Sequence, residues 1–205
     1  MGIKEFLKKE FIDKNFFKTY FSSSTKTAQE NPYLNVSSGT YYEQFPSKNL
    51  YDEYSNIVDK HFKLNDEIQI KYSIAINQDT IFNDYAEQCK SLCLEDIKLA
   101  PILKEYIDKK AQLNKNKPFY PFYPSFSFLA KLYEKKNEID SAILICIEAI
   151  KLGFTLDHSK AGMQGRLARL IKKHNQNSDK KLQFDYEKNI LFDDETGEPL
   201  FNDKE

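Results

Sequence analysis

Hydrophobic residues recur at helical spacing most clearly between residues 123 and 156. Apolar side chains return every three or four positions in two stretches, which is the period of one helix face. A polar run at 135–138 separates the two stretches and is long enough for a short turn. Gly153 follows the last periodic residue, where a helix can end in a left-handed conformation at little steric cost. We therefore predict an antiparallel pair of helices.

Small residues lie where the two predicted helices would cross. Ala130 belongs to the first helix, and Ala142 belongs to the second, so the two backbones can approach closely. With their neighbours they resemble the tetratricopeptide repeat, a helical hairpin of about 34 residues. The residues that carry the resemblance are Phe126, Leu129, Ala130, Tyr133, Ala142, Cys146 and Ala149. Phe154 departs from it, because the family often has proline there. Any tight helical hairpin needs small residues at its crossing, so a hairpin outside this family fits the pattern as well.

The resemblance implies a non-enzymatic module that binds a protein or a peptide. In this family the first helices line a concave groove, and the corresponding positions of this chain are Ser127, Lys131, Glu134 and Lys135. Helical geometry also exposes these positions, since they lie opposite the apolar face. Lysines here suit an acidic peptide or a free carboxylate, as in the carboxylate-binding members of the family. We expect a protein or peptide partner, and in particular one with acidic groups.

Residues 159–174 predict an amphipathic helix that caps the repeat. Its polar face carries Arg166, Arg169 and Lys173, and no acidic residue lies between His158 and Ser178. Both arginines of the chain are here, and arginine presents a planar fork of donors that suits carboxylate or phosphate. Binding of an anion or a nucleic acid through this helix is therefore the alternative function. A solvated helix face explains the same pattern without a ligand.

Two segments alternate between apolar and polar residues, which is the period of a strand. The first follows a helix predicted from Ser47 to about residue 62, and its apolar residues are Ile68, Ile70, Tyr72, Ile74 and Ile76. In the second, residues 182–201, a DDETGE turn separates two short apolar stretches, as in a hairpin. We expect a mainly α fold of helical hairpins with a capping helix, and minor strands at 68–76 and 182–201.

Composition divides the chain into three segments. Residues 1–46 begin with an irregularly amphipathic stretch at 3–21, which we predict to be a helix, and continue as a polar loop. We expect this helix to pack on the protein rather than on a membrane surface. Residues 47–178 form the predicted helical domain. Residues 179–205 are acidic, since eight acidic residues stand against two lysines from position 182 onward. We expect this segment to fold back over Arg166 and Arg169, either as permanent structure or as a lid.

A proline-rich connector, KPFYPFYPSF, precedes the repeat. Pro118, Pro121 and Pro124 are three residues apart, so in a polyproline II helix all of them would share one edge. The segment is then either a ligand for an aromatic groove or a rigid connector whose rings pack on the repeat. We favour the connector.

Charge and cysteine content indicate the kind of partner and the cellular compartment. The 205 residues have a formal net charge of -1, so no overall field favours nucleic acid or a membrane as the main partner. Three cysteines without disulfide spacing indicate a reducing compartment. We see no signal-peptide core and no apolar run of membrane-spanning length. We expect a cytoplasmic protein, and the many lysines beside two arginines fit an AT-rich bacterial or phage genome.

No pattern in the chain predicts catalysis. It contains no glycine-rich phosphate loop, no His-Glu-x-x-His motif and no nucleophile elbow. His61 lies on an apolar helix face, as a packed histidine does. Cys89 and Cys93 share a helix face without further ligands nearby in sequence, as small buried residues do. We expect no enzyme activity, no cofactor and no metal.

Overall fold

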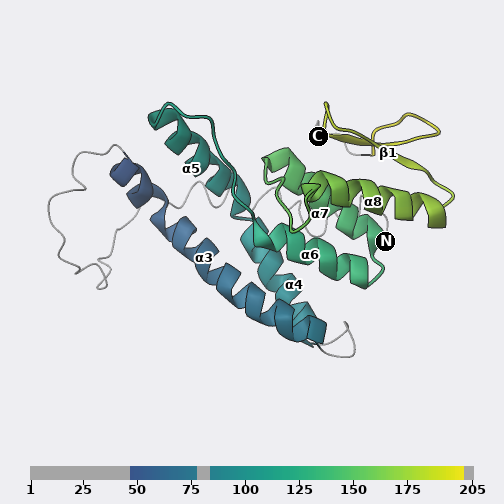
Figure 1. Ribbon diagram of the computed structural model, residues 1–205, viewed down its shortest axis with the longest axis horizontal. Coiled ribbons are helices and arrows are strands. Elements are labelled where there is room, and N and C mark those ends of the chain that lie inside the picture. Colours follow the sequence, from purple (N-terminus) through teal and green to yellow (C-terminus); the bar gives the residue numbers. More distant parts are fainter. Residues whose placement is uncertain (1–46, 78–83, 201–205) are drawn as a thin grey trace. The chain divides into compact units, whose positions relative to one another are not determined.

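The computed structural model describes residues 47–77 and 84–200, which form six helices and one two-stranded sheet (Figure 1). The helices are α3 (Ser47–Asn77), α4 (Asp84–Ile97), α5 (Ala100–Leu113), α6 (Pro124–Lys135), α7 (Ile139–Leu152) and α8 (Gly162–Asn177), and the strands are β1 (Leu182–Asp185) and β2 (Ile190–Asp193). The predicted mainly α fold with a minor β component is confirmed. The N-terminal helix and loop predicted for residues 1–46 lie outside the described residues.

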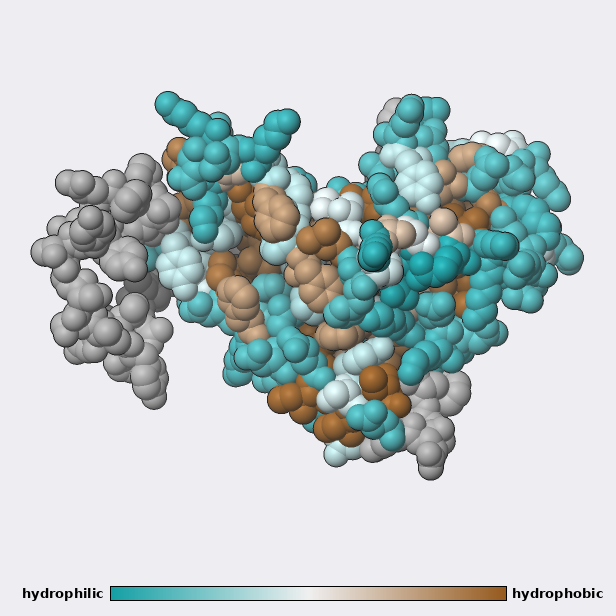
Figure 2. Space-filling model, viewed as in Figure 1, coloured by the Kyte–Doolittle hydropathy of each residue, from teal (hydrophilic) through white to brown (hydrophobic). Residues whose placement is uncertain are grey.

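The strand predicted at residues 68–76 is wrong, because α3 continues through it as one helix. Ile68 and Ala75 are fully buried at helical spacing, and the Cys89 thiol of α4 donates to the Ile68 carbonyl at 3.8 Å. A helix pairs its own backbone groups, whereas a lone strand would leave them unpaired. Residues 68–76 alternate between apolar and polar in the sequence because isoleucine also occupies the outer side of α3, where Ile70 is 58% exposed. Figure 2 shows apolar side chains at the surface near the end of α3 and the start of α4.

The predicted pair of helices at 123–156 is confirmed, since α6 and α7 lie side by side and are joined by a short turn (Figure 1). Ala130 and Ala142 are fully buried, as expected where two helices touch. Gly153 ends α7 in the left-handed region with φ 88°. The Phe154 N–H then donates to the Ala149 carbonyl at 2.9 Å, which closes the helix end.

Three of the other helices pack on this pair. α6 also packs on α4, while α7 packs on α8 and on α5. The α8 helix covers residues 162–177 rather than the predicted 159–174, and its residues Met163, Leu167 and Leu170 face the interior. None of the helices between residues 47 and 177, as far as they are described, is both long and apolar enough to cross a membrane.

The β structure predicted within residues 182–201 is confirmed, but the hairpin turn lies at 186–189 and not at DDETGE, which begins at the end of β2 and is spanned by a single bridge between Phe192 and Pro199. β1 and β2 pair in antiparallel fashion, with Leu182 opposite Asp193, and the hairpin lies against α8 (Figure 1). The Asn175 side chain of α8 accepts from the Leu182 N–H at 2.8 Å and donates to the Leu182 carbonyl at 3.0 Å. Leu191 is 1% exposed, so an apolar contact accompanies these bonds.

Candidate partner-binding surface

The residues predicted to line a groove on α6 do not all reach the surface. Lys135 is exposed, Lys131 and Glu134 are half-buried, and Ser127 is fully buried. The prediction that Ser127 is a surface residue is wrong, because the α7–α8 loop covers this part of α6 and places Asp157 against it. The predicted set therefore divides into an interior group and a surface group.

The interior group is an ion-pair network centred on Asp157, whose side chain is 0% exposed. Its carboxylate accepts a hydrogen bond from the Ser127 hydroxyl and two from Arg166, through Nε at 3.0 Å and Nη2 at 2.8 Å. Arg166 Nη1 in turn donates to Glu134 Oε2 at 2.9 Å. This Asp157 network, formed by Ser127, Glu134, Asp157 and Arg166, joins α6, the α7–α8 loop and α8.

Arg166 was predicted on the exposed face of α8, and that placement is wrong. Its side chain is 7% exposed, because the loop before α8 brings an acidic partner within reach of the guanidinium. Burial by itself would raise the pKa of the Asp157 carboxyl. Hydrogen bonds from Ser127 and from the His158 backbone, together with the charge of Arg166, outweigh burial and hold that pKa below its ordinary value.

The signal for this pair was present in the sequence. Asp157 is the last acidic residue before the long acid-free stretch that contains both arginines. A helical period assigns Arg166 to a face of α8, but it does not say that a long side chain reaches back to a loop nine residues earlier.

The surface group surrounds Phe128, whose half-buried ring lies on the outer side of α6. Tyr72 of α3 stacks on Phe128 with ring centroids 4.4 Å apart, and His158 of the α7–α8 loop lies 5.8 Å from it. Phe122 contacts the His158 ring at 4.7 Å. The ammonium of Lys131 lies over Phe128, 5.6 Å from the ring centroid. These residues form the Phe128 cluster: Tyr72, Phe122, Phe128, Lys131 and His158.

The positive charge of the Phe128 cluster has no carboxylate partner within residues 47–77 and 84–200. Lys131 makes no hydrogen bond or ion pair there, and the Asp157 carboxylate is already held by Ser127 and Arg166. Burial lowers the pKa of Lys131, and the charge of Arg166 lowers it further while Asp157 opposes this. Partial burial also lowers the pKa of His158, with the Lys131 charge as a second cause. The cluster thus offers donors to an anionic group beside apolar rings.

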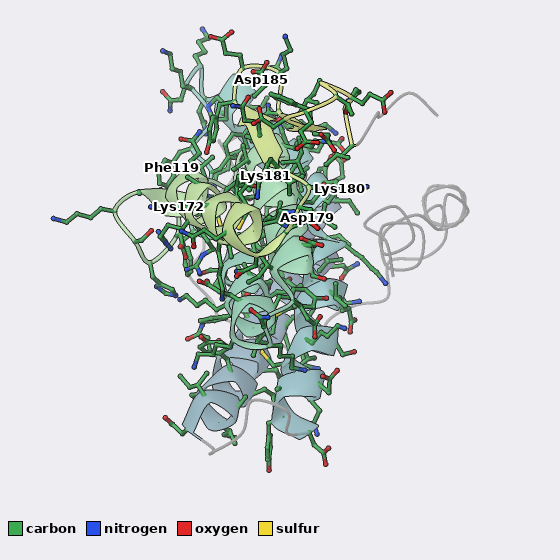
Figure 3. All side chains as sticks on the ribbon, turned by 90° about the vertical axis from the view of Figure 1, so that its right-hand side faces the viewer. Phe119, Lys172, Asp179, Lys180, Lys181 and Asp185 are labelled. Atoms are coloured by element: carbon green, nitrogen blue, oxygen red, sulfur yellow. The ribbon has the colours of Figure 1, made fainter. Side chains whose placement is uncertain are left out.

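The basic face predicted on α8 carries fewer charges than expected, because Arg166 is buried. Arg169 is exposed and donates only to the Gly165 carbonyl at 3.3 Å within the described part of the chain, and Lys173 is half-buried. The hairpin was expected to cover the arginines. It instead contacts α8 through Asn175 and through the Tyr186 hydroxyl, which donates to the Gln164 carbonyl at 3.4 Å. Figure 3 shows Asp179, Lys180 and Lys181 around the end of α8, where the chain turns toward the hairpin.

A second buried carboxylate, Asp96, binds a histidine and a serine, the residue types of a catalytic triad. His61 Nδ1 lies 2.8 Å from Asp96 Oδ1, and the Ser125 hydroxyl donates to Asp96 Oδ2. Because His61 and Ser125 bind different oxygens of the same carboxylate, the imidazole is not in position to take the hydroxyl proton. The Tyr123 hydroxyl adds a bond to the Asp96 carbonyl at 2.7 Å, so these contacts tie α3, α4 and α6 together.

Comparison with known proteins adds no relative. The chain matches no protein-family model, and it has no significant match among curated proteins or among solved structures. The resemblance to the tetratricopeptide repeat therefore rests on the residues of the helical pair alone.

Proposed function

We propose that this protein is a non-enzymatic module that binds an acidic segment of a partner protein or peptide through the Phe128 cluster. The observation that carries the proposal is Lys131, a half-buried cation that lies over an aromatic ring without a carboxylate partner in the described residues. A bound carboxylate would supply the missing partner, and the surrounding rings would contact the apolar side chains next to it.

A peptide fits this surface better than a small anion or a nucleic acid does. Four separate parts of the chain contribute rings, namely α3, the connector before α6, α6 and the α7–α8 loop, so the ligand gains apolar contact as well as charge. The chain as a whole has a formal net charge of -1, which gives no general attraction for phosphates.

The alternative function, binding of an anion or a nucleic acid by α8, has less support. Arg166 is neutralised by Asp157 and Glu134, which leaves Arg169, Lys172 and Lys173 for such a ligand. Phosphate binding by these residues would weaken steeply with added salt, whereas a packed peptide interface would weaken less.

The expected setting is the reducing cytoplasm of a bacterium or the host cell of a phage. The cysteines of the described residues, Cys89, Cys93 and Cys146, are free and buried, which is compatible with that setting. Burial raises the pKa of the Cys146 thiol to about 12, so this thiol is a packing residue rather than a nucleophile.

The proposal is tested with a fluorescent peptide of Glu, Asp and Phe residues and a counterpart in which Lys replaces the acids. Fluorescence anisotropy is expected to show saturable binding of the acidic peptide only. Lys131→Met keeps the apolar stem and removes the charge, and we expect it to weaken binding about tenfold. Lys63→Met, at an exposed position of α3 outside the predicted binding residues, is the matched control. Equal binding by both variants would contradict the proposal.

A further inference from the structure

The connector between α5 and α6 is buried with a period of three residues. Tyr123 is buried and Tyr120 is half-buried, whereas Pro118, Phe119 and Pro121 are exposed. Phe119 is 74% exposed, more than any other large apolar side chain in the described residues. Three residues per turn is the repeat of a polyproline II helix, so one edge of the connector faces the protein and another faces solvent.

Two tyrosines fix this connector from either side of Pro121. The Tyr120 hydroxyl donates to Asp108 and accepts from Lys104 Nζ at 3.0 Å. The Tyr123 ring lies 4.7 Å from the Phe154 ring, and its hydroxyl is bound to the α4 backbone. The predicted role as a connector whose rings pack on the repeat agrees with these contacts. They also present Phe119 from a backbone that is held in place.

A single exposed apolar residue is ordinary on a protein surface, so exposure alone indicates nothing. What distinguishes this edge is its charge and its stiffness. Lys115 and Lys117 are exposed just before it in the chain, and neither forms an ion pair within the described ranges. The sequence contains no acidic residue between Asp108 and Glu134. The edge is therefore apolar and stiffened by proline, and the positions that precede it in the chain carry positive charge.

We infer that Pro118, Phe119 and Pro121 form a ligand edge for a partner protein whose groove is lined with aromatic rings and bordered by carboxylates. Prolines at a spacing of three pack between such rings, and a segment held in its bound conformation loses little entropy on binding. The neighbouring lysines match the carboxylates of the groove. It shares no residue with the Phe128 cluster, although Phe122 of that cluster follows Pro121 in the chain, and it presents a ligand rather than receiving one.

A single-stranded nucleic acid is the competing ligand, because it also binds to rings and lysines. Nucleic-acid surfaces of that kind stack successive bases on several exposed rings. Phe119 is the one ring of the connector that is exposed, since Tyr120 and Phe122 are half-buried and Tyr123 is buried. The observations therefore favour the protein groove.

The test uses the full chain and, as the probe, an isolated SH3 domain, whose groove is aromatic and acidic. Isothermal titration calorimetry is expected to show saturable binding that weakens about tenfold in the double variant Pro118→Ala/Pro121→Ala and in Phe119→Ala. Ile70→Ala removes another exposed apolar side chain and serves as the control, with binding unchanged. Circular dichroism melts show whether each variant is folded.

Absence of saturable SH3 binding would overturn the inference, and so would equal binding by the double proline variant. A thymidine oligonucleotide tests whether single-stranded nucleic acid, the competing ligand, binds this edge. If it binds the chain and Phe119→Ala abolishes that binding while the SH3 domain does not bind, the edge is a nucleic-acid surface and the inference is wrong.

Discussion

Arg166 reaches back from α8 to Asp157 and directs two donors at the same carboxylate oxygen, Oδ2, at 3.0 and 2.8 Å. The remaining nitrogen of its guanidinium binds Glu134 on α6, so one side chain joins two helices and the loop before α8. Both members of the pair are removed from solvent. The arrangement fixes α8 and also determines which positive charges stay available at the surface.

Asp157→Asn is expected to destabilise the protein by about 3 kcal/mol, because it leaves the buried Arg166 charge without its main partner. The free energy of unfolding is measured by urea denaturation. Asp179→Asn, in an exposed turn, is the control and should change stability by less than about 0.5 kcal/mol. Similar unfolding energies for both variants would show that the network contributes little.

The Asp157 network also predicts a dependence of stability on pH. The pKa of the Asp157 carboxyl is lowered in the folded protein, so its contribution is fully present above the unfolded pKa of about 3.9 and is lost as pH falls through the folded pKa. The difference in unfolding energy between the parent and Asp157→Asn should therefore be constant near neutral pH and shrink below about pH 4. A difference that grows on acidification would contradict this sign.

Gly153→Ala is expected to cost more than Gly197→Ala, although both glycines have positive φ values, of 88° and 66°. A Cβ atom at Gly153 would lie 2.9 Å from ring carbons of Tyr120, whereas the space at Gly197 is open. Tyr120 has little freedom to move because Asp108 and Lys104 hold its hydroxyl. Thermal melts should show a loss of about 1 kcal/mol for Gly197→Ala and a clearly larger loss for Gly153→Ala. Equal losses would mean that the ring moves freely.

Leu191→Ala tests whether the C-terminal hairpin is permanent structure or a lid. Leu191 is 1% exposed, so its truncation should lower the free energy of unfolding by about 3 kcal/mol if the hairpin unfolds together with the helices. Phe192→Ala, on the other face of β2, should cost less because that side chain is partly exposed. If the main unfolding transition does not move in Leu191→Ala, the hairpin opens independently and a lid is the better description.

Local patterns predicted the elements of the fold better than they predicted its site. Ala130 and Ala142 identified the helical pair because tight helix crossing needs small residues at fixed positions. The isoleucines of residues 68–76 gave a wrong strand prediction, because the same alternation arises when both sides of a helix carry isoleucine. Of the four, Ile68 alone is fully buried, and Ile74 is half-buried. The contact of the Cys89 thiol of α4 with the Ile68 carbonyl of α3 is also absent from the pattern of one segment.

The site depended on contacts between segments far apart in the sequence. Lys131 was identified from its place on α6, but the ring of Tyr72 that completes its surroundings comes from α3. Arg166 was assigned to the surface because its neighbours on α8 are polar, and the loop carboxylate that buries it lies outside the helical period. Periodicity assigns a face to each residue, and the partner on that face is a property of the tertiary structure.

The pKa of the Lys131 ammonium tests binding at the Phe128 cluster most directly. It is measured by NMR on lysine-labelled protein, with Lys131→Met as the assignment control. In the free protein this pKa should lie below its ordinary value, because burial is not balanced by a carboxylate. Saturation with the acidic peptide should raise it, since a bound carboxylate favours the charged form. A pKa that is unchanged when the peptide is bound would contradict binding at the Phe128 cluster, and an ordinary value in the free protein would show that Lys131 is already paired.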